Sequence, residues 1–162
     1  MRKRTRVLLV DDDPLILRAS VRALEEGGFE LFQATSGAEG LALVKEKRPD
    51  LLLLDVVLPD MDGFEVCRQI KADPALSDTF VVFVSNYRTA PDDQADGLES
   101  GADGYIARPI ANRELVARVH AMARIQRAQA ETRARAQQQE AVAWLGQQAL
   151  RTALPEDLLK EA

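Results

Sequence analysis

Apolar residues along this chain gather in short runs, and segments with helical spacing lie between the runs. Five runs predict β-strands, at residues 6–10, 29–34, 51–54, 80–84 and 105–107. The run at 51–54 consists of leucine alone, which favours a strand buried on both faces over one that is half exposed. Because strands and helices alternate, the pattern is typical of an α/β fold, an open parallel sheet with helices on both faces.

Capping residues and helix breakers mark where the helices begin. Pro14 suits the first turn of the first helix, and Asp13 is its expected N-cap. Ser36 is the expected N-cap of the second helix. Asp60 and Asp62 follow the leucine strand, and we expect both to serve the turn and the cap of the next helix.

The last predicted helix carries a long extension. It begins near Asn112, and residues 126–140 are strong helix formers without a breaker, so we expect the helix to continue to about Leu150. Pro155 predicts the end of this helix, and we expect Leu158 and Leu159 to start another one. The sequence therefore divides into a compact domain at 1–124 and, at 125–162, a helical signalling linker or the start of a downstream domain.

This extension predicts an interaction surface. A single exposed helix is only marginally stable in water, which favours a partner helix and hence a homodimer through the C-terminal helix. Apolar residues return near the end of the extension around Trp144, which we expect to lie in an interface. This patch resembles the opening helix of a GAF-type sensor domain.

Composition limits the class of protein. The chain has 162 residues, of which 46% are hydrophobic and 29% are charged, as in a globular domain with a full core. We find neither a stretch of membrane-spanning length nor a signal peptide, and Cys67 is the single cysteine, which excludes an internal disulfide. These features predict a cytoplasmic protein that does not bind membranes.

The charge distribution disfavours nucleic-acid binding by this segment. Residues 1–111 carry 13 Lys and Arg against 20 Asp and Glu, a balance of −7, and residues 112–162 carry 8 against 6, a balance of +2. A nucleic-acid surface needs a concentrated basic face, which an acidic domain with a mildly basic tail does not offer.

Polar side chains follow the carboxyl ends of the predicted strands. Asp11 and Asp12 follow the first strand, Asp55 the third, Ser85 the fourth and Arg108 the fifth. Ligands of open α/β sheets bind at this edge. Three carboxylates that meet there repel one another, and a divalent cation removes the conflict. Mg²⁺ is favoured because the site offers few protein oxygens and leaves room for water and a phosphoryl group.

The same residues suggest phosphoryl chemistry. A carboxylate such as that of Asp55 can attack a phosphoryl group to form an acyl phosphate. Ser85 could donate a hydrogen bond to a phosphoryl oxygen, and the Arg108 guanidinium could neutralise its charge. For Arg108, a surface ion pair with an acid is the competing hypothesis.

Four motifs together resemble the receiver domain of two-component response regulators, the CheY-like family. They are VLLVDDDP at 7–14, LLLLDVVLPDMDG at 51–63, VVFVS at 81–85 and GADGYIARP at 101–109. The resemblance covers about residues 5–124. It implies a (βα)5 doubly wound, five-stranded parallel sheet with strand order 2-1-3-4-5, and a signalling domain in place of a metabolic enzyme.

The resemblance also implies roles for individual residues. Asp55 would accept a phosphoryl group from a sensor histidine kinase or a phosphotransfer protein. Ser85 and Tyr105 would form the switch that responds to it. The ligands of Mg²⁺ would be Asp11, Asp12, Asp55 and the backbone carbonyl of Val57. One possible setting is the N-terminal receiver of a hybrid histidine kinase, with a sensor or output domain downstream.

Two residues depart from the family pattern. Arg108 stands where the family has an almost universal lysine before a cis-proline, here Pro109, and Asn86 stands where a small residue is usual. The exchange of lysine for arginine is not neutral, because the guanidinium is planar and longer. A pseudo-receiver, a dimerisation module that phosphate does not switch, is therefore an alternative.

A phosphatase is the second alternative. Asp11 and Asp13 form a D-x-D pair after a strand, as in haloacid-dehalogenase-type phosphatases, where the two would be nucleophile and general acid/base. That family's pattern expects Thr or Val where this chain has Leu15, and the chain lacks cap-domain sequence and a suitable downstream lysine.

Overall fold

Strands and helices alternate from the first strand to the last helix. The structure is a computed structural model that describes residues 3–86 and 91–153, without the side chains of 91–94. The elements are β1 (Arg6–Val10), α1 (Pro14–Glu26), β2 (Glu30–Ala34), α2 (Gly37–Lys47), β3 (Leu51–Leu54), α3 (Gly63–Ala72), β4 (Phe80–Ser85), α4 (Pro91–Glu99), β5 (Gly104–Ala107) and α5 (Asn112–Ala153). This order confirms the predicted α/β alternation.

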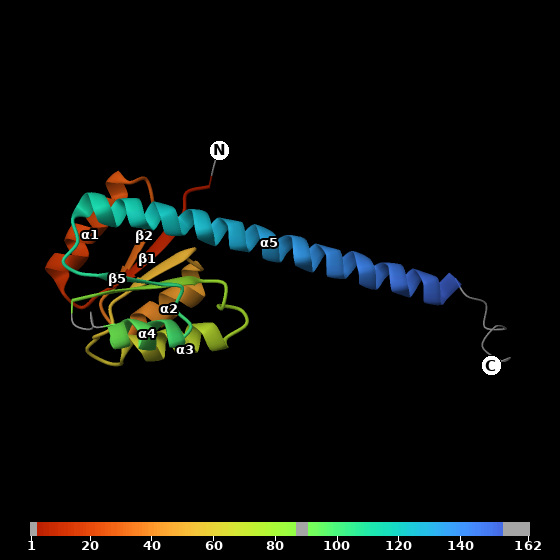
Figure 1. Ribbon diagram of the computed structural model, residues 1–162, viewed down its shortest axis with the longest axis horizontal. Coiled ribbons are helices and arrows are strands. Elements are labelled where there is room, and N and C mark those ends of the chain that lie inside the picture. Colours follow the sequence, from red (N-terminus) through yellow and green to blue (C-terminus); the bar gives the residue numbers. More distant parts are fainter. Residues whose placement is uncertain (1–2, 87–90, 154–162) are drawn as a thin grey trace. The chain divides into compact units, whose positions relative to one another are not determined.

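The strands form one parallel sheet with the order β2-β1-β3-β4-β5, as predicted. Helices cover both faces: α1 and the first part of α5 lie on one side, and α2, α3 and α4 lie on the other (Figure 1). Because β1 and β3 are neighbours with Val10 opposite Leu54, the residues that follow these two strands emerge side by side.

The core explains why the strands contain almost no polar residues. Alternate side chains of the central strands enter two separate apolar layers, one on each face of the sheet. Leu52, Leu54 and Phe83 pack toward α2 and α3, whereas Leu53 and Val82 pack toward α1 and α5. Cys67 of α3 is buried, as expected.

Helix caps agree with the sequence pattern at three helices and differ at one residue. The Asp13 carboxylate accepts hydrogen bonds from Leu15 N and Ile16 N, Ser36 Oγ accepts one from Glu39 N, and Asp62 accepts one from Phe64 N. The prediction that Asp60 caps the helix that follows it is wrong.

Asp60 caps a helix that precedes it in the chain. Its two carboxylate oxygens accept from Gly37 N at 2.8 Å and Ala38 N at 2.9 Å, at the start of α2. These N–H groups have no partner within their own helix, and their dipoles favour a negative charge, so they hold the pKa of Asp60 below its usual range. The loop after β3 is thereby tied to α2.

Residues 127–153 belong to a structural unit separate from residues 3–126. Residues 127–153 are helical throughout, and their side chains are exposed. The helix reaches Ala153, slightly beyond the predicted Leu150, whereas the predicted break at Pro155 and the helix at 158–159 lie outside the described residues. None of the described helices is long and apolar enough to cross a membrane.

Phe83 is the largest fully buried side chain of the sheet, and its ring lies against those of Phe64 and Tyr105. We expect Phe83→Ala to lower the free energy of unfolding by about 3–5 kcal/mol, because it removes buried area and leaves a cavity. Urea unfolding followed by circular dichroism measures this. Leu98→Ala is the control, since Leu98 is exposed and its loss is expected to change stability by less than about 0.5 kcal/mol. Equal effects of the two substitutions would contradict the assigned core.

Candidate functional site

Three carboxylates meet at the carboxyl edge of the sheet. Asp11 and Asp12 follow β1, and Asp55 follows β3. Backbone hydrogen bonds hold this edge in register, with Asp55 N donating to Val10 O at 2.9 Å. One oxygen of each carboxylate lies within 4.8 Å of the others. These hard oxygen donors fit a hard divalent cation.

The surroundings of the three carboxylates differ. Asp11 is buried, Asp55 is half-buried and Asp12 is exposed. Asp11 Oδ1 accepts a hydrogen bond from Asp13 N at 2.9 Å, which orients the buried carboxylate. The Asp13 side chain caps α1 and is therefore occupied with a structural task.

Asp55 is a carboxyl group whose ionisation is opposed by its environment. Burial and the negative charge of Asp11 raise its pKa from 3.8 to about 6. The backbone N–H of Val57 and the positive charge of Arg108 act in the opposite direction and are outweighed. A cation that joined the three carboxylates would favour the ionised form that a nucleophile needs.

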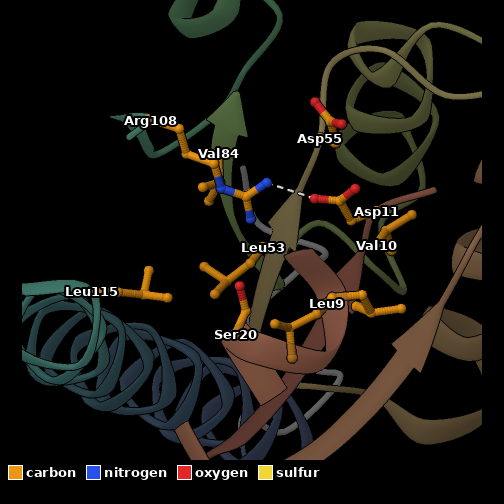
Figure 2. A pocket seen from close by; sticks show the side chains of 10 residues that line it. Leu9, Val10, Asp11, Ser20, Leu53, Asp55, Val84, Arg108 and Leu115 are labelled. Atoms are coloured by element: carbon orange, nitrogen blue, oxygen red, sulfur yellow. Dashed lines mark hydrogen bonds and ion pairs between the residues drawn. The ribbon is translucent and has the colours of Figure 1, made fainter. Parts of the chain in front are cut away.

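Arg108 supplies a positive charge at this edge of the sheet, and its guanidinium forms an ion pair with Asp11. Its Nη1 donates to Asp11 Oδ2 at 2.6 Å, and the two side chains are only 12% and 6% exposed (Figure 2). The backbone N of Arg108 also donates to Ser85 O, which attaches the end of β5 to the end of β4. The sequence left open a phosphate contact or a surface ion pair for Arg108. The structure shows an ion pair, and that pair is buried.

The guanidinium lies beside a small cavity of about 10 Å³, room for about one water molecule (Figure 2). The cavity is lined by Leu9, Val10, Asp11, Leu17, Ser20, Leu53, Asp55, Val84, Arg108 and Leu115. Most of these side chains are apolar and belong to the sheet, α1 and α5. In such surroundings an ion pair is stronger than it would be in water.

Ser85 and Tyr105, the expected switch residues, belong to the neighbouring strands β4 and β5. Ser85 is the last residue of β4 and is fully buried. Tyr105 of β5 is half-buried, and its ring centroid lies 6.2 Å from that of Phe83. A Cβ on Gly97 of α4 would lie 3.3 Å from the Tyr105 ring, so α4 packs closely on this tyrosine.

Val57 and Asn86 lie in exposed positions beside the site. Val57 N faces Asp55 Oδ1 at 3.4 Å, and Val57 forms an isolated antiparallel bridge with Asp62. Asn86 follows β4 and is exposed. The loop closes tightly, because a Cβ on Gly63 would lie only 2.3 Å from the carbonyl oxygen of Asp55. Only glycine allows this approach.

Sequence reasoning missed the role of Asp60, which lies at this edge of the sheet. Its partners at the start of α2 lie 22 and 23 positions earlier in the chain, beyond the reach of a local pattern. The aspartate alone could have indicated a cap, but only the fold shows which helix it caps.

Comparison with known proteins identifies the family of this fold and site. The family model of the response regulator receiver domain matches residues 7–120. The transcriptional regulatory protein AfsQ1 of Streptomyces coelicolor is 42% identical over 118 residues, which are 73% of this chain and 51% of that protein. The DNA-binding response regulator MtrA of Mycolicibacterium smegmatis is 41% identical over 121 residues, 75% of this chain and 51% of that protein.

Solved structures agree with the family match. A CheY-like response regulator receiver domain protein from Methanospirillum hungatei is 30% identical, with a TM-score of 0.72 over 78% of this chain and 99% of that one. The receiver domain of a signal transduction histidine kinase from Syntrophus aciditrophicus is 31% identical, with a TM-score of 0.67 over 74% of this chain and 89% of that one.

The chain spans about half the length of the curated relatives it matches. The match itself covers the whole sheet, its strand order and the edge that carries Asp11, Asp12 and Asp55. With this fold and this acidic edge, the chain belongs to the response regulator receiver family.

Proposed function

We propose that Asp55 is the phosphoacceptor of this receiver domain and takes a phosphoryl group from a histidine of a sensor kinase or a phosphotransfer protein. The observation that carries the proposal is the position of Asp55, half-buried at the strand end beside two further carboxylates and one guanidinium. In the transfer, a bond forms between a carboxylate oxygen and phosphorus while the phosphorus–nitrogen bond of the donor histidine breaks.

The proposal includes a Mg²⁺ ion at the acidic cluster. The residues that would hold it are Asp11, Asp12, Asp55 and the Val57 backbone carbonyl. When bound, the ion neutralises charge on the carboxylates and the phosphoryl oxygens. Since all proposed donors are oxygen atoms and few come from the protein, the set suits Mg²⁺ better than Ca²⁺.

The other tasks belong to side chains at neighbouring strand ends. The Ser85 hydroxyl would donate a hydrogen bond to a phosphoryl oxygen, and the Arg108 guanidinium would bring positive charge to the phosphoryl group. Tyr105 would pass the change to α4, against which its ring packs. The domain would catalyse only its own phosphorylation and dephosphorylation, and its output would be a changed surface.

One observation favours the pseudo-receiver as a second candidate. The Arg108 guanidinium already neutralises Asp11, so the site has a built-in cation that could replace the metal. The phosphatase hypothesis is disfavoured by the family match and by Asp13, whose carboxylate is occupied in capping α1.

We also propose that the receiver domain is joined to an output domain in a longer protein. Relatives are named transcriptional or DNA-binding regulators and are about twice the matched length, which supports an output domain joined to the receiver. We assign residues 1–124 to the receiver and 125–162 to a helical linker or the start of that domain, without nucleic-acid contacts of its own. Cytoplasmic location remains a prediction.

Phosphorylation can be tested by intact-mass measurement after incubation with Mg²⁺ and acetyl phosphate. We expect the mass of one phosphoryl group to be added, because Asp55 is accessible enough to attack a small donor. Asp55→Asn is the matched control and should gain nothing, and omission of Mg²⁺ should abolish the gain. An unmodified wild-type protein under every condition would favour the pseudo-receiver.

The raised pKa of Asp55 predicts a pH dependence of Mg²⁺ binding. Because its carboxyl holds a proton up to about pH 6, the ligand form is lost as the pH falls through this value. We expect the affinity to fall about fivefold between pH 6 and 5 and to approach a tenfold fall per pH unit below pH 5, as one proton competes with the metal. Calorimetric titration across this range measures it. Asp55→Asn, which cannot titrate there, should show a weaker and flatter profile, and a flat wild-type profile would contradict the prediction.

A homodimer through the C-terminal helix is testable by light scattering. Val142, Leu145 and Leu150 are exposed on residues 127–153, and burial against a second copy would remove them from water. We expect the wild-type chain to have a dimer mass and Leu145→Lys to be monomeric. Gln147→Lys, which adds the same charge without removing an apolar side chain, is the control. A monomeric wild-type chain would contradict the prediction.

A further inference from the structure

Both oxygens of the buried Asp11 carboxylate are already in use. Oδ1 accepts from Asp13 N at 2.9 Å, and Oδ2 accepts from Arg108 Nη1 at 2.6 Å. The same carboxylate belongs to the three that could hold a metal ion. A divalent cation at this cluster would therefore have to share the Asp11 carboxylate with the guanidinium.

The surroundings make simultaneous occupation unfavourable. The two side chains of the ion pair are almost fully buried, and the cavity beside them has mainly apolar walls, Leu9, Leu17 and Leu53 among them. Beside such apolar walls, the repulsion between a guanidinium and a nearby divalent cation is weakly screened.

We propose that Arg108 competes with the divalent cation for Asp11 and thereby sets the metal affinity of this receiver. Metal binding displaces the guanidinium from Asp11 and leaves it available for a phosphoryl group on Asp55, so the two events are coupled. The inference rests on the proposed function, since it assigns to Arg108 the regulation of that same site. It concerns arginine in particular, because its long, planar fork spans from β5 to the end of β1.

Magnesium titration by calorimetry, without a phosphodonor, tests the competition. Arg108→Met removes the competitor and should bind Mg²⁺ about 5- to 150-fold more tightly, the range typical of coupled sites. Arg108→Lys keeps the positive charge but has a shorter side chain with a single ammonium, so its affinity should lie between those of Arg108→Met and the wild type. Arg118→Met removes one charge from an exposed pair with Glu114 and should match the wild type.

The variants separate direct competition from charge alone. If Arg108→Lys binds Mg²⁺ no more tightly than the wild type while Arg108→Met does, long-range charge accounts for the effect and the proposal is overturned. Equal affinities of the wild type and Arg108→Met overturn it as well.

A second measurement observes the guanidinium directly. In ¹⁵N-edited spectra of the wild-type protein, the Nε–Hε signal of Arg108, assigned by its loss in Arg108→Lys, should shift when Mg²⁺ is added. An unchanged signal at saturating Mg²⁺ would show that the ion pair persists and would sink the proposal.

Failure of the inference and failure of the proposed function give different results. A wild-type protein that binds Mg²⁺ and is phosphorylated on Asp55, but in which Arg108→Met has no tighter binding, overturns the competition alone. Absence of Mg²⁺ binding in the wild type and in every variant overturns both.

Discussion

The structure depends on the meeting of three negative charges at one edge of a sheet. Parallel register brings the ends of β1 and β3 together, and the carboxylates of Asp11, Asp12 and Asp55 follow them. Like charges at this separation repel one another, so the site is unstable without a cation. Arg108 forms an ion pair with Asp11, whereas burial and the charge of Asp11 raise the pKa of Asp55 to about 6. The edge is therefore an acidic cluster whose charge the chain itself neutralises only in part.

The remainder of the domain holds this edge in place. Two apolar layers make the sheet rigid on both faces, so its strand ends cannot separate to relieve the repulsion. The loop that follows Asp55 is held at several points: Asp60 caps α2, Asp62 caps α3, and Gly63 lies against the Asp55 carbonyl. A change at Asp55 would thus reach two helices through this loop.

β5 is the second route from the site to the surface. It carries Tyr105, whose ring packs near Phe83 and Gly97, and it is followed directly by Arg108, which binds Asp11 at the site. The backbone of Arg108 is hydrogen bonded to that of Ser85, so two strand ends move together. A competition for Asp11 would therefore act at the end of the strand that carries Tyr105, the proposed switch residue.

The sequence by itself determined the elements and the acidic residues that follow the strands, and its resemblance to the receiver family predicted the strand order. The all-leucine run, the caps at Asp13 and Ser36 and the aspartates after two strands are local signals, since periodicity and capping operate over a few residues. Only the tertiary structure decided which helix Asp60 caps, that the Arg108 ion pair is buried on Asp11, and that burial raises the pKa of Asp55. Arg108 and Asp11 are 97 positions apart, and their contact depends on the distance and dielectric that packing creates, which no local pattern records.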